Sequence, residues 1–452
     1  MKSKFWSTVF GIMALTVSLS AEAKPFLDDE VSLFLNTKNN KNQSLPVIIT
    51  FQTTESFNEL PHHPFNHAEV QRKMMTENQF KIDMLINQKN KKNIFNLWIA
   101  KSALTNVDRQ ELGELSNQSE ISMITFAHKK IVMAPTKMRK PQVVQSLTYG
   151  LKNIKIPELR AKYPELTGRG MIVGVLDTGV TPTHPDLKGK ILAYKNFSPN
   201  SDQNPIDDFG HGTHVTGTMV GGATSGLAIG VAPEAKVVVG KIFDVKGEST
   251  KEEILKAMQW IADPDGNPNT NDFPVVVNNS WGDDEPYRSR DPKEDEFCTV
   301  IDSWIKLGMV PVFTAGNNGP RDETINVPGA CPNALTVGAV DQFDRNPRFS
   351  SSGPTSWKTI KTIKPDVVAP GVDVKSANQF GRYENMSGTS MAAPHVSGAM
   401  ALIIQAKPEL TVEEAIKSLI MGVQDFGRAG KDNTFGEGRI DLLKTIELIK
   451  KQ

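Results

Sequence analysis

The stretch of sequence that decides the fold is residues 385–395, Asn385-Met386-Ser387-Gly388-Thr389-Ser390-Met391-Ala392-Ala393-Pro394-His395. Alternation before Gly388 is typical of a strand, and the small apolar residues that follow predict a buried helix from Met391 to about Gln405. Ser387, Thr389 or Ser390 could supply the N-cap oxygen of that helix. A serine here is also well placed to be a nucleophile, because unpaired first-turn N–H groups face the same space. A lone serine is more simply a helix cap, so the interpretation depends on the residues upstream.

Three upstream segments also place a polar side chain at the end of a predicted element. Asp177 ends an apolar strand, His211 begins a helix, and Asn317 follows another strand. These segments read Gly174-Val175-Leu176-Asp177-Thr178-Gly179, Gly210-His211-Gly212-Thr213-His214 and Thr314-Ala315-Gly316-Asn317. Because the carboxyl ends of parallel strands form the ligand-binding edge of a sheet, we expect these side chains to meet Ser390 there. Taken singly, each has an ordinary role as a turn cap, a helix start or a turn residue.

Together, these residue types suit nucleophilic catalysis. A histidine can take the proton of a serine near neutral pH and return it to a leaving amine. A carboxylate fixes the tautomer of the imidazole and stabilises the imidazolium. The amide of Asn317 and the N–H of Ser390 can bind an oxyanion. We therefore predict that Asp177, His211 and Ser390 are catalytic and that Asn317 is the oxyanion residue.

The four motifs resemble those of the subtilase family of serine proteases, with the chain order Asp, His, Ser. The matching boxes are D-T-G, H-G-T-H, A-G-N and G-T-S-M-A-x-P, and the resemblance covers about Leu147 to the C-terminus. The segment 277–282, Val-Asn-Asn-Ser-Trp-Gly, is most similar to the bacillopeptidase F branch. The resemblance implies an α/β fold of the subtilisin-like three-layer α/β/α type, with a central, mostly parallel sheet.

The resemblance also implies a substrate-binding role for two segments. They would line the primary specificity pocket, and the first would pair with the backbone of an extended substrate. Their residues are Ser280, Trp281 and Gly282, and Thr314, Ala315 and Gly316. Core packing is the alternative for Trp281, but its Asn-rich, Gly-flanked setting favours a surface groove.

Apolar runs in the rear part of the chain alternate with helical patterns. This alternation independently indicates a parallel sheet that is covered on both faces. The predicted strands are 171–176, 237–242, 275–278, 310–314 and 335–340. The predicted helices are 214–220, 250–261, 297–307, 412–421 and 440–450.

The composition divides the chain into residues 1–23, 24–142 and 143–452. The first part reads as a signal peptide, with Lys2 and Lys4 before a short apolar run and a small-x-small end, so we expect secretion, extracellular or periplasmic. In the second part, strands at 45–52, 94–100, 120–127 and 130–133 and helices at 68–88 and 107–116 give a small α+β pattern of ferredoxin-like type. The family resemblance implies a propeptide that assists folding and acts as an intramolecular inhibitor until cleaved. Residues 134–145 read as a linker before the peptidase domain.

The charge and hydropathy of the chain limit the kinds of partner that the protein is expected to bind. Lys plus Arg and Asp plus Glu each number 51, so the net charge is zero and bulk electrostatics favour neither nucleic acid nor membrane. No segment after the leader is apolar enough to span a membrane. We expect a monomer that acts on protein or peptide substrates.

Cys298 and Cys331 are the two cysteines of the chain. In an exported protein the pair favours a disulfide, with two buried thiols as the alternative. The disulfide would close a loop that contains Asn317.

Two places in the sequence could suggest a metal site. His62, His63 and His67 cluster but match no ligand spacing, which favours a solvated loop. Subtilases often bind calcium through a loop after the catalytic histidine. Here residues 219–227 are short and lack Asn and Asp, although Asp186 would match one ligand. We expect no cofactor for the chemistry, and structural calcium has no assignable site.

Two other functions compete with a secreted serine endopeptidase made as an autoprocessed zymogen. An α/β-hydrolase would need G-x-S-x-G and the chain order Ser, acid, His, which this sequence lacks. An inactive subtilase-fold binding protein is the remaining alternative. All four catalytic positions are filled, and this favours the enzyme.

Overall fold

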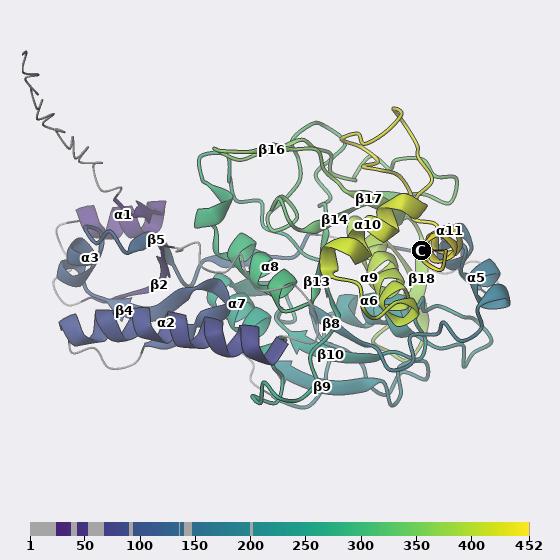
Figure 1. Ribbon diagram of the computed structural model, residues 1–452, viewed down its shortest axis with the longest axis horizontal. Helices are drawn as coiled ribbons and strands as arrows, with labels where there is room; N and C mark the ends of the chain where they lie inside the picture. Colours follow the sequence, from purple (N-terminus) through teal and green to yellow (C-terminus); the bar gives the residue numbers. More distant parts are fainter. Residues whose placement is uncertain are drawn as a thin grey trace, which may run out of the picture.

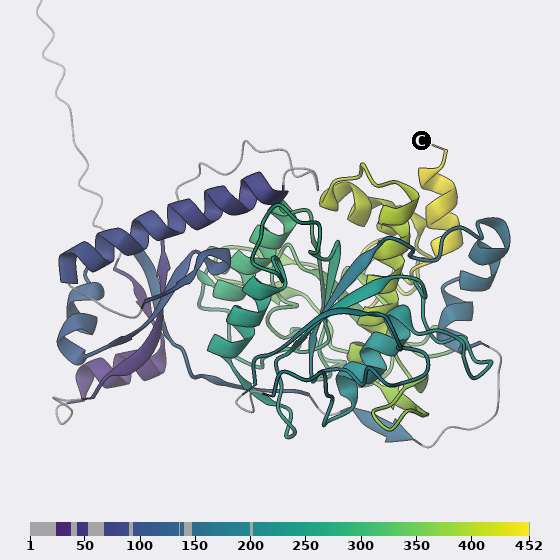
Figure 2. The ribbon, with the colours of Figure 1, turned by 90° about the horizontal axis from the view of Figure 1, so that it is seen from below.

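The computed structural model describes residues 24–37, 43–52, 67–89, 94–134, 136–139, 147–198 and 202–451. The predicted signal peptide, His62 and His63, and the predicted boundary at residue 142 lie outside these residues. Figures 1 and 2 show a small α+β unit at one end of the molecule and a larger layered domain beside it.

A seven-stranded, entirely parallel sheet forms the centre of the larger domain. The strands lie in the order β17-β14-β13-β12-β8-β10-β9. Their bounds are β8 Ile172–Asp177, β9 Ile191–Asn196, β10 Lys236–Lys241, β12 Val276–Asn279, β13 Val310–Thr314, β14 Leu335–Val340 and β17 Val367–Pro370. The five predicted strands are present. The two edge strands were missed, because β9 is only half-buried and β17 has four residues.

Helices cover both faces of this sheet, as predicted for a three-layer fold. On one face α6 (His211–Val220) and α9 (Thr389–Ala406) pack together and against the strands. On the other face lie α7 (Lys251–Trp260) and α8 (Glu296–Lys306). Outside α9 lie shorter helices, namely α4 Tyr149–Asn153, α5 Ile156–Lys162, α10 Val412–Gly422 and α11 Leu442–Ile449.

The front unit is a five-stranded sheet with three helices. Its strand order is β1-β5-β2-β4-β3, antiparallel except for the pair β1 and β5. The elements are β1 Phe26–Leu27, α1 Asp29–Asn36, β2 Leu45–Phe51, α2 His67–Lys89, β3 Phe95–Leu97, the 3-10 turn Trp98–Ala100, β4 Ser102–Val107, α3 Arg109–Leu115 and β5 Ile121–Phe126. The second helix is confirmed, with Asp108 as its N-cap in a capping box with Glu111. The strand predicted at 94–100 was wrong in part, because it ends in the 3-10 turn, and β1, α1 and β4 were missed.

The alternation along β2 fixes how the two units pack. Val47, Ile49 and Phe51 point into the core of the front unit, whereas Ile48 points toward α7 and α8. Since side chains of a strand alternate between faces, a single strand serves both cores. His67 at the start of α2 strengthens this interface, with its ring nitrogens 2.9 and 3.0 Å from the carbonyl oxygens of Leu307 and Ala262. It is therefore a buried interface residue, and the prediction of a solvated loop was wrong for it.

Residues 130–134 and 136–139 lie between the front unit and the strands of the larger domain with which they pair. The strand β6 (Lys130–Val132) pairs antiparallel with β11 (Glu248–Thr250). A few residues later β7 (Lys137–Arg139) pairs antiparallel with β19 (Tyr383–Ser387), whose other neighbour is β18 (Val374–Ala377). The predicted linker therefore includes a strand, which single-segment periodicity could not reveal.

Cys298 and Cys331 form a disulfide, with their Cα atoms 5.4 Å apart. The bond joins the first turn of α8 to the loop before β14, and the predicted pairing is confirmed.

Candidate active site

Asp177 and His211 meet at the carboxyl edge of the central sheet. Asp177 is the last residue of β8 and His211 the first of α6. His211 Nδ1 lies 2.7 Å from Asp177 Oδ1, and both side chains are fully buried. Burial alone would lower the pKa of His211, but the carboxylates of Asp177 and Asp207 outweigh burial and raise it. The pair can therefore hold a positive charge on the imidazole.

Ser390 lies in the first turn of α9, the helix that packs against α6. Its hydroxyl donates to the carbonyl oxygen of Ser280 at 3.0 Å, and the Ser280 hydroxyl donates to the Ser390 carbonyl at 2.8 Å. His211 Nε2 is buried and makes no hydrogen bond. The structure thus joins Asp177 to His211, and Ser390 to Ser280 rather than to His211.

Asn317 follows β13 and is held by the start of α9. Its Oδ1 accepts from the N–H of Thr389 at 2.9 Å and lies 2.9 Å from the Thr389 hydroxyl. The amide nitrogen is on the side of Gly388, where an added Cβ would lie 3.4 Å from it. The oxygen is therefore occupied, and the Nδ2 group is the part of the side chain left to donate.

The expected cap of α9 was wrong. Gly388 occupies the N-cap position, and no side chain of its own segment caps the helix. Asn317 supplies the missing acceptor from a distant part of the chain. This leaves the hydroxyl of Ser390 outside the capping interaction.

The two predicted substrate-binding segments are neighbours. Ser280 to Gly282 follow β12, and Thr314 to Gly316 end and follow β13, which pairs with β12. The Asn326 side chain lies against both glycines, because an added Cβ would approach its atoms to 2.9 Å at Gly282 and 1.8 Å at Gly316. Glycine is thus required where the two segments and Asn326 meet, a contact that the motifs did not reveal.

The side chain of Trp281 does not lie in a groove. It is 1% exposed and packs edge-on against three phenylalanines, Phe243, Phe297 and Phe313. The predicted surface position was wrong, because a large ring gains more from burial among aromatic neighbours than its Gly-flanked setting suggests. Thr314 is also buried, with its hydroxyl hydrogen-bonded to that of Thr389.

Met133 and Thr136, on the segment that follows β6, lie close to this part of the larger domain. The Met133 N–H donates to the carbonyl of Gly247 at 2.9 Å, which continues the pairing of β6 with β11. The Thr136 methyl group lies beside Gly388, since an added Cβ there would be 3.5 Å away. A segment of the front part of the chain therefore lies next to Asn317 and the start of α9.

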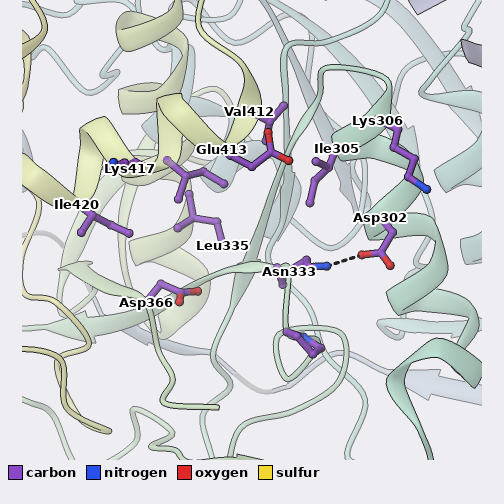
Figure 3. Close-up of a pocket in the computed structure, with 13 residues that line it drawn as sticks. Asp302, Ile305, Lys306, Asn333, Leu335, Asp366, Val412, Glu413, Lys417 and Ile420 are labelled. Carbon is purple, nitrogen blue, oxygen red and sulfur yellow. Dashed lines mark hydrogen bonds between the residues drawn. The ribbon is translucent and has the colours of Figure 1, made fainter. Parts of the chain in front are cut away.

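A pocket of about 550 Å³ lies elsewhere, between α8 and α10. Figure 3 shows Ile305 and Lys306 on one side of it and Glu413 and Lys417 on the other. Leu335 at its floor begins β14, so this pocket is at the amino edge of the sheet. It is separate from the cluster at the carboxyl edge.

Asp186, the residue that would match one calcium ligand of the family, is hydrogen-bonded within the protein. Asp186 accepts from the Thr224 N–H at 2.6 Å and from the Tyr383 hydroxyl at 2.6 Å, one on each oxygen. Each oxygen of this carboxylate thus accepts one hydrogen bond from the protein. Another three carboxylates, Asp263, Asp265 and Asp272, are close enough to share a cation in a partly exposed loop.

No helix within the described ranges is long and apolar enough to cross a membrane.

A model of the Subtilase family matches residues 168–438, more than half of the chain. The matched range includes the sheet and every residue of the cluster described above. The fold and the match define a serine-type endopeptidase with a subtilisin-like α/β/α architecture. The chain belongs to the subtilase family, as the motifs had predicted.

Named relatives agree with this assignment. Serine protease AprX of Bacillus subtilis (strain 168) is 35% identical over 306 residues, 62% of this chain and 67% of that protein. Bacillopeptidase F of the same organism is 34% identical over 350 residues, 70% of this chain and 23% of that protein. Subtilisin E is 35% identical over 273 residues, 60% of this chain and 64% of that protein. The chain thus spans about two thirds of AprX and of Subtilisin E, and less than a quarter of Bacillopeptidase F.

Proposed function

We propose that the protein is a secreted endopeptidase, made as a zymogen, that uses Asp177, His211 and Ser390 as its catalytic triad. The hydrogen bond between Asp177 and His211 carries the proposal, because it fixes the imidazole with a buried, unpartnered Nε2. In this mechanism the Ser390 hydroxyl turns away from the carbonyl of Ser280 and donates its proton to this nitrogen. The Ser390 oxygen then attacks the peptide carbonyl, and His211 returns the proton to the leaving amine.

The oxyanion of the tetrahedral intermediate would be bound by two donors. One is the N–H of Ser390 in the first turn of α9, and the other is the Nδ2 group of Asn317. Because the Asn317 oxygen is held by Thr389, the nitrogen needs no reorganisation when charge develops. The segments 280–282 and 314–316 would present backbone groups to the substrate.

The front unit would act as the propeptide and intramolecular inhibitor. This part of the proposal is supported by β6 and β7, which pair with β11 and β19 on either side of the cluster. An extended chain pairing with strand edges is the mode in which peptides add to a sheet. Self-cleavage would fall in the connection between Val132 and Lys137, upstream of the boundary that composition suggests. Residues 1–23 support export.

The test uses the full-length chain expressed with its leader. We expect a shortened product in the medium or periplasm whose N-terminus, read by Edman sequencing, lies between residues 133 and 137. It should hydrolyse casein and react with a fluorophosphonate probe. A full-length product that neither reacts nor cleaves casein would instead support the inactive binding protein.

A further inference from the structure

Asp207 is a second buried carboxylate beside the proposed triad, and the mechanism above assigns it no role. It lies in the loop before α6 and is 5% exposed. The inference below rests on the proposed function, because it concerns how His211 works.

Each oxygen of Asp207 holds a different part of the site. Oδ1 accepts from the Thr178 hydroxyl at 2.9 Å and from the Gly210 N–H at 2.7 Å. Oδ2 accepts from the N–H and the hydroxyl of Thr213, at 2.7 and 2.6 Å. The carboxylate therefore binds backbone N–H groups on both sides of His211.

Thr178 connects this carboxylate to Asp177. Its N–H donates to Asp177 Oδ1 at 2.7 Å, and its hydroxyl accepts from the Gly212 N–H at 2.8 Å. Asp207 thus holds the end of β8 and the start of α6 in one network, and these are the two elements that bring Asp177 and His211 together. An error of about 1 Å between such groups can lower turnover by roughly a hundredfold.

The charge of Asp207 also acts on the imidazole. Burial lowers the pKa of His211, but Asp177 and, to a smaller degree, Asp207 raise it. Asp208, the next residue, is paired with the buried Lys241 at 2.7 Å. The other charged and titratable groups around His211 and Asp207 come from five elements and from the loop itself. They are Asp177 on β8, Tyr194 on β9, His214 on α6, Lys241 on β10, Glu384 on β19, and Asp208 in the loop.

We propose that Asp207 is a positioning residue that holds His211 against Asp177 and stabilises the imidazolium formed when Ser390 loses its proton. The carboxylate acts through the backbone at Gly210 and Thr213 and through space on the ring. It does not touch the substrate.

The test compares the pH dependence of kcat/KM for mature Asp207→Asn, Thr213→Val and wild-type enzyme on a peptide anilide. Asp207→Asn removes a negative charge that raises the pKa of His211. The acid side of the profile of kcat/KM against pH (the acid limb) should therefore shift to lower pH, and the maximal kcat/KM (the plateau) should fall roughly 10- to 100-fold. Thr213→Val removes the hydroxyl that donates to Asp207 and accepts from the Thr181 N–H, and it keeps the charge of Asp207. It should lower the plateau less and leave the acid limb in place.

Asp432→Asn is the matched control, because Asp432 also holds a loop by accepting backbone N–H groups but lies in the C-terminal segment. It should match wild type in both readouts. If Asp207→Asn does not fold, Asp207→Ser replaces it, since a serine hydroxyl can still accept from Gly210.

Two outcomes would overturn the inference. If kcat/KM of Asp207→Asn is unchanged across the pH range, Asp207 has no role in the reaction. If the plateau falls but the acid limb does not move, the role of Asp207 is only structural. The proposed function fails separately, if wild type itself neither reacts with a fluorophosphonate nor cleaves the anilide.

Discussion

The side-chain oxygen of Asn317 accepts a hydrogen bond from the backbone N–H of Thr389 at 2.9 Å. One asparagine thereby caps α9 and has its amide turned so that only the nitrogen remains to donate. The N–H of the next residue, Ser390, belongs to the same turn. The helix start and the proposed oxyanion donors are therefore fixed by a single contact.

Replacing Asn317 with Ala should lower kcat by about 10²–10³-fold with little change in KM, because the lost bond forms mainly in the transition state. The Asn317→Asp variant separates the two roles, since it keeps an acceptor for Thr389 and loses the donor. Both variants should lose activity on a small anilide substrate. If Asn317→Asp kept its turnover, the residue would be a helix cap only.

Replacing Ser390 with Ala should leave the fold intact and lower turnover by roughly a millionfold, the scale given for subtilisin. The uncut precursor should accumulate, because the proposed self-cleavage needs the same hydroxyl. The measurement is electrophoresis of the expressed protein in a protease-deficient host. Normal shortening of this variant would contradict self-processing. Ser397→Ala, on the same helix and hydrogen-bonded to Asn278, is a suitable control.

Removing the disulfide should destabilise the protein. The bond closes a loop over a sequence separation of 33, and such a loop contributes about 3–4 kcal/mol by constraining the unfolded chain. The Cys298→Ser/Cys331→Ser double variant should therefore melt at a lower temperature in calorimetry, and it should also lose activity, since Asn317 lies within the loop. An unchanged melting temperature would show that the bond does not stabilise the fold.

Acid should destabilise the protein through buried histidines. Burial lowers the pKa of His395 from 6.5 to about 4, and the same cause lowers that of His214 to about 3. Because the unfolded chain then binds protons more readily, stability present above pH 6.5 is lost as the pH falls toward 4. For His395 alone the loss is roughly 3 kcal/mol by that pH.

The test of this pH effect uses urea unfolding of the Ser390→Ala precursor, which avoids autolysis. In that background His395→Asn keeps a donor for the Met391 carbonyl and should lose less stability on acidification. Equal losses with and without His395 would refute the assignment.

Metal removal should leave the proposed chemistry intact, because the proposed triad and oxyanion donors use no metal ion. Each oxygen of Asp186 also already accepts a hydrogen bond, from Thr224 and Tyr383. We expect kcat/KM on a peptide anilide to be the same before and after dialysis against EDTA. A loss restored by calcium would contradict this. It would direct attention to the loop that carries Asp263, Asp265 and Asp272.

Long apolar runs made the fold predictable. The strand at 310–314 and that at 335–340 were predicted to the residue, because each is buried on both faces. Among the strands that were missed, β7, β9 and β17 lack such an apolar run. β9 is half-buried, β17 is short, and β7 exists only through its partner β19, so no local pattern marks them.

The site was predictable where residue type and position at an element end coincide, as for Asp177 and His211. Its supporting contacts were not. The bond from Asn317 to Thr389 crosses 72 residues of sequence, and that from Thr178 to Asp207 crosses 29. Trp281 was misplaced because a motif shows which residue is present but not which way its ring points.

The pairing of β6 with β11 makes inhibition a question of concentration. While one chain carries both strands, dilution cannot separate them. The proposed active site meets the inhibitory strand at an effective concentration that is set only by the chain connecting the two units. After a cut between them, the front unit is a separate molecule that must compete with substrate by mass action. The cleaved enzyme would therefore stay inhibited where its concentration is high and become active where it is diluted.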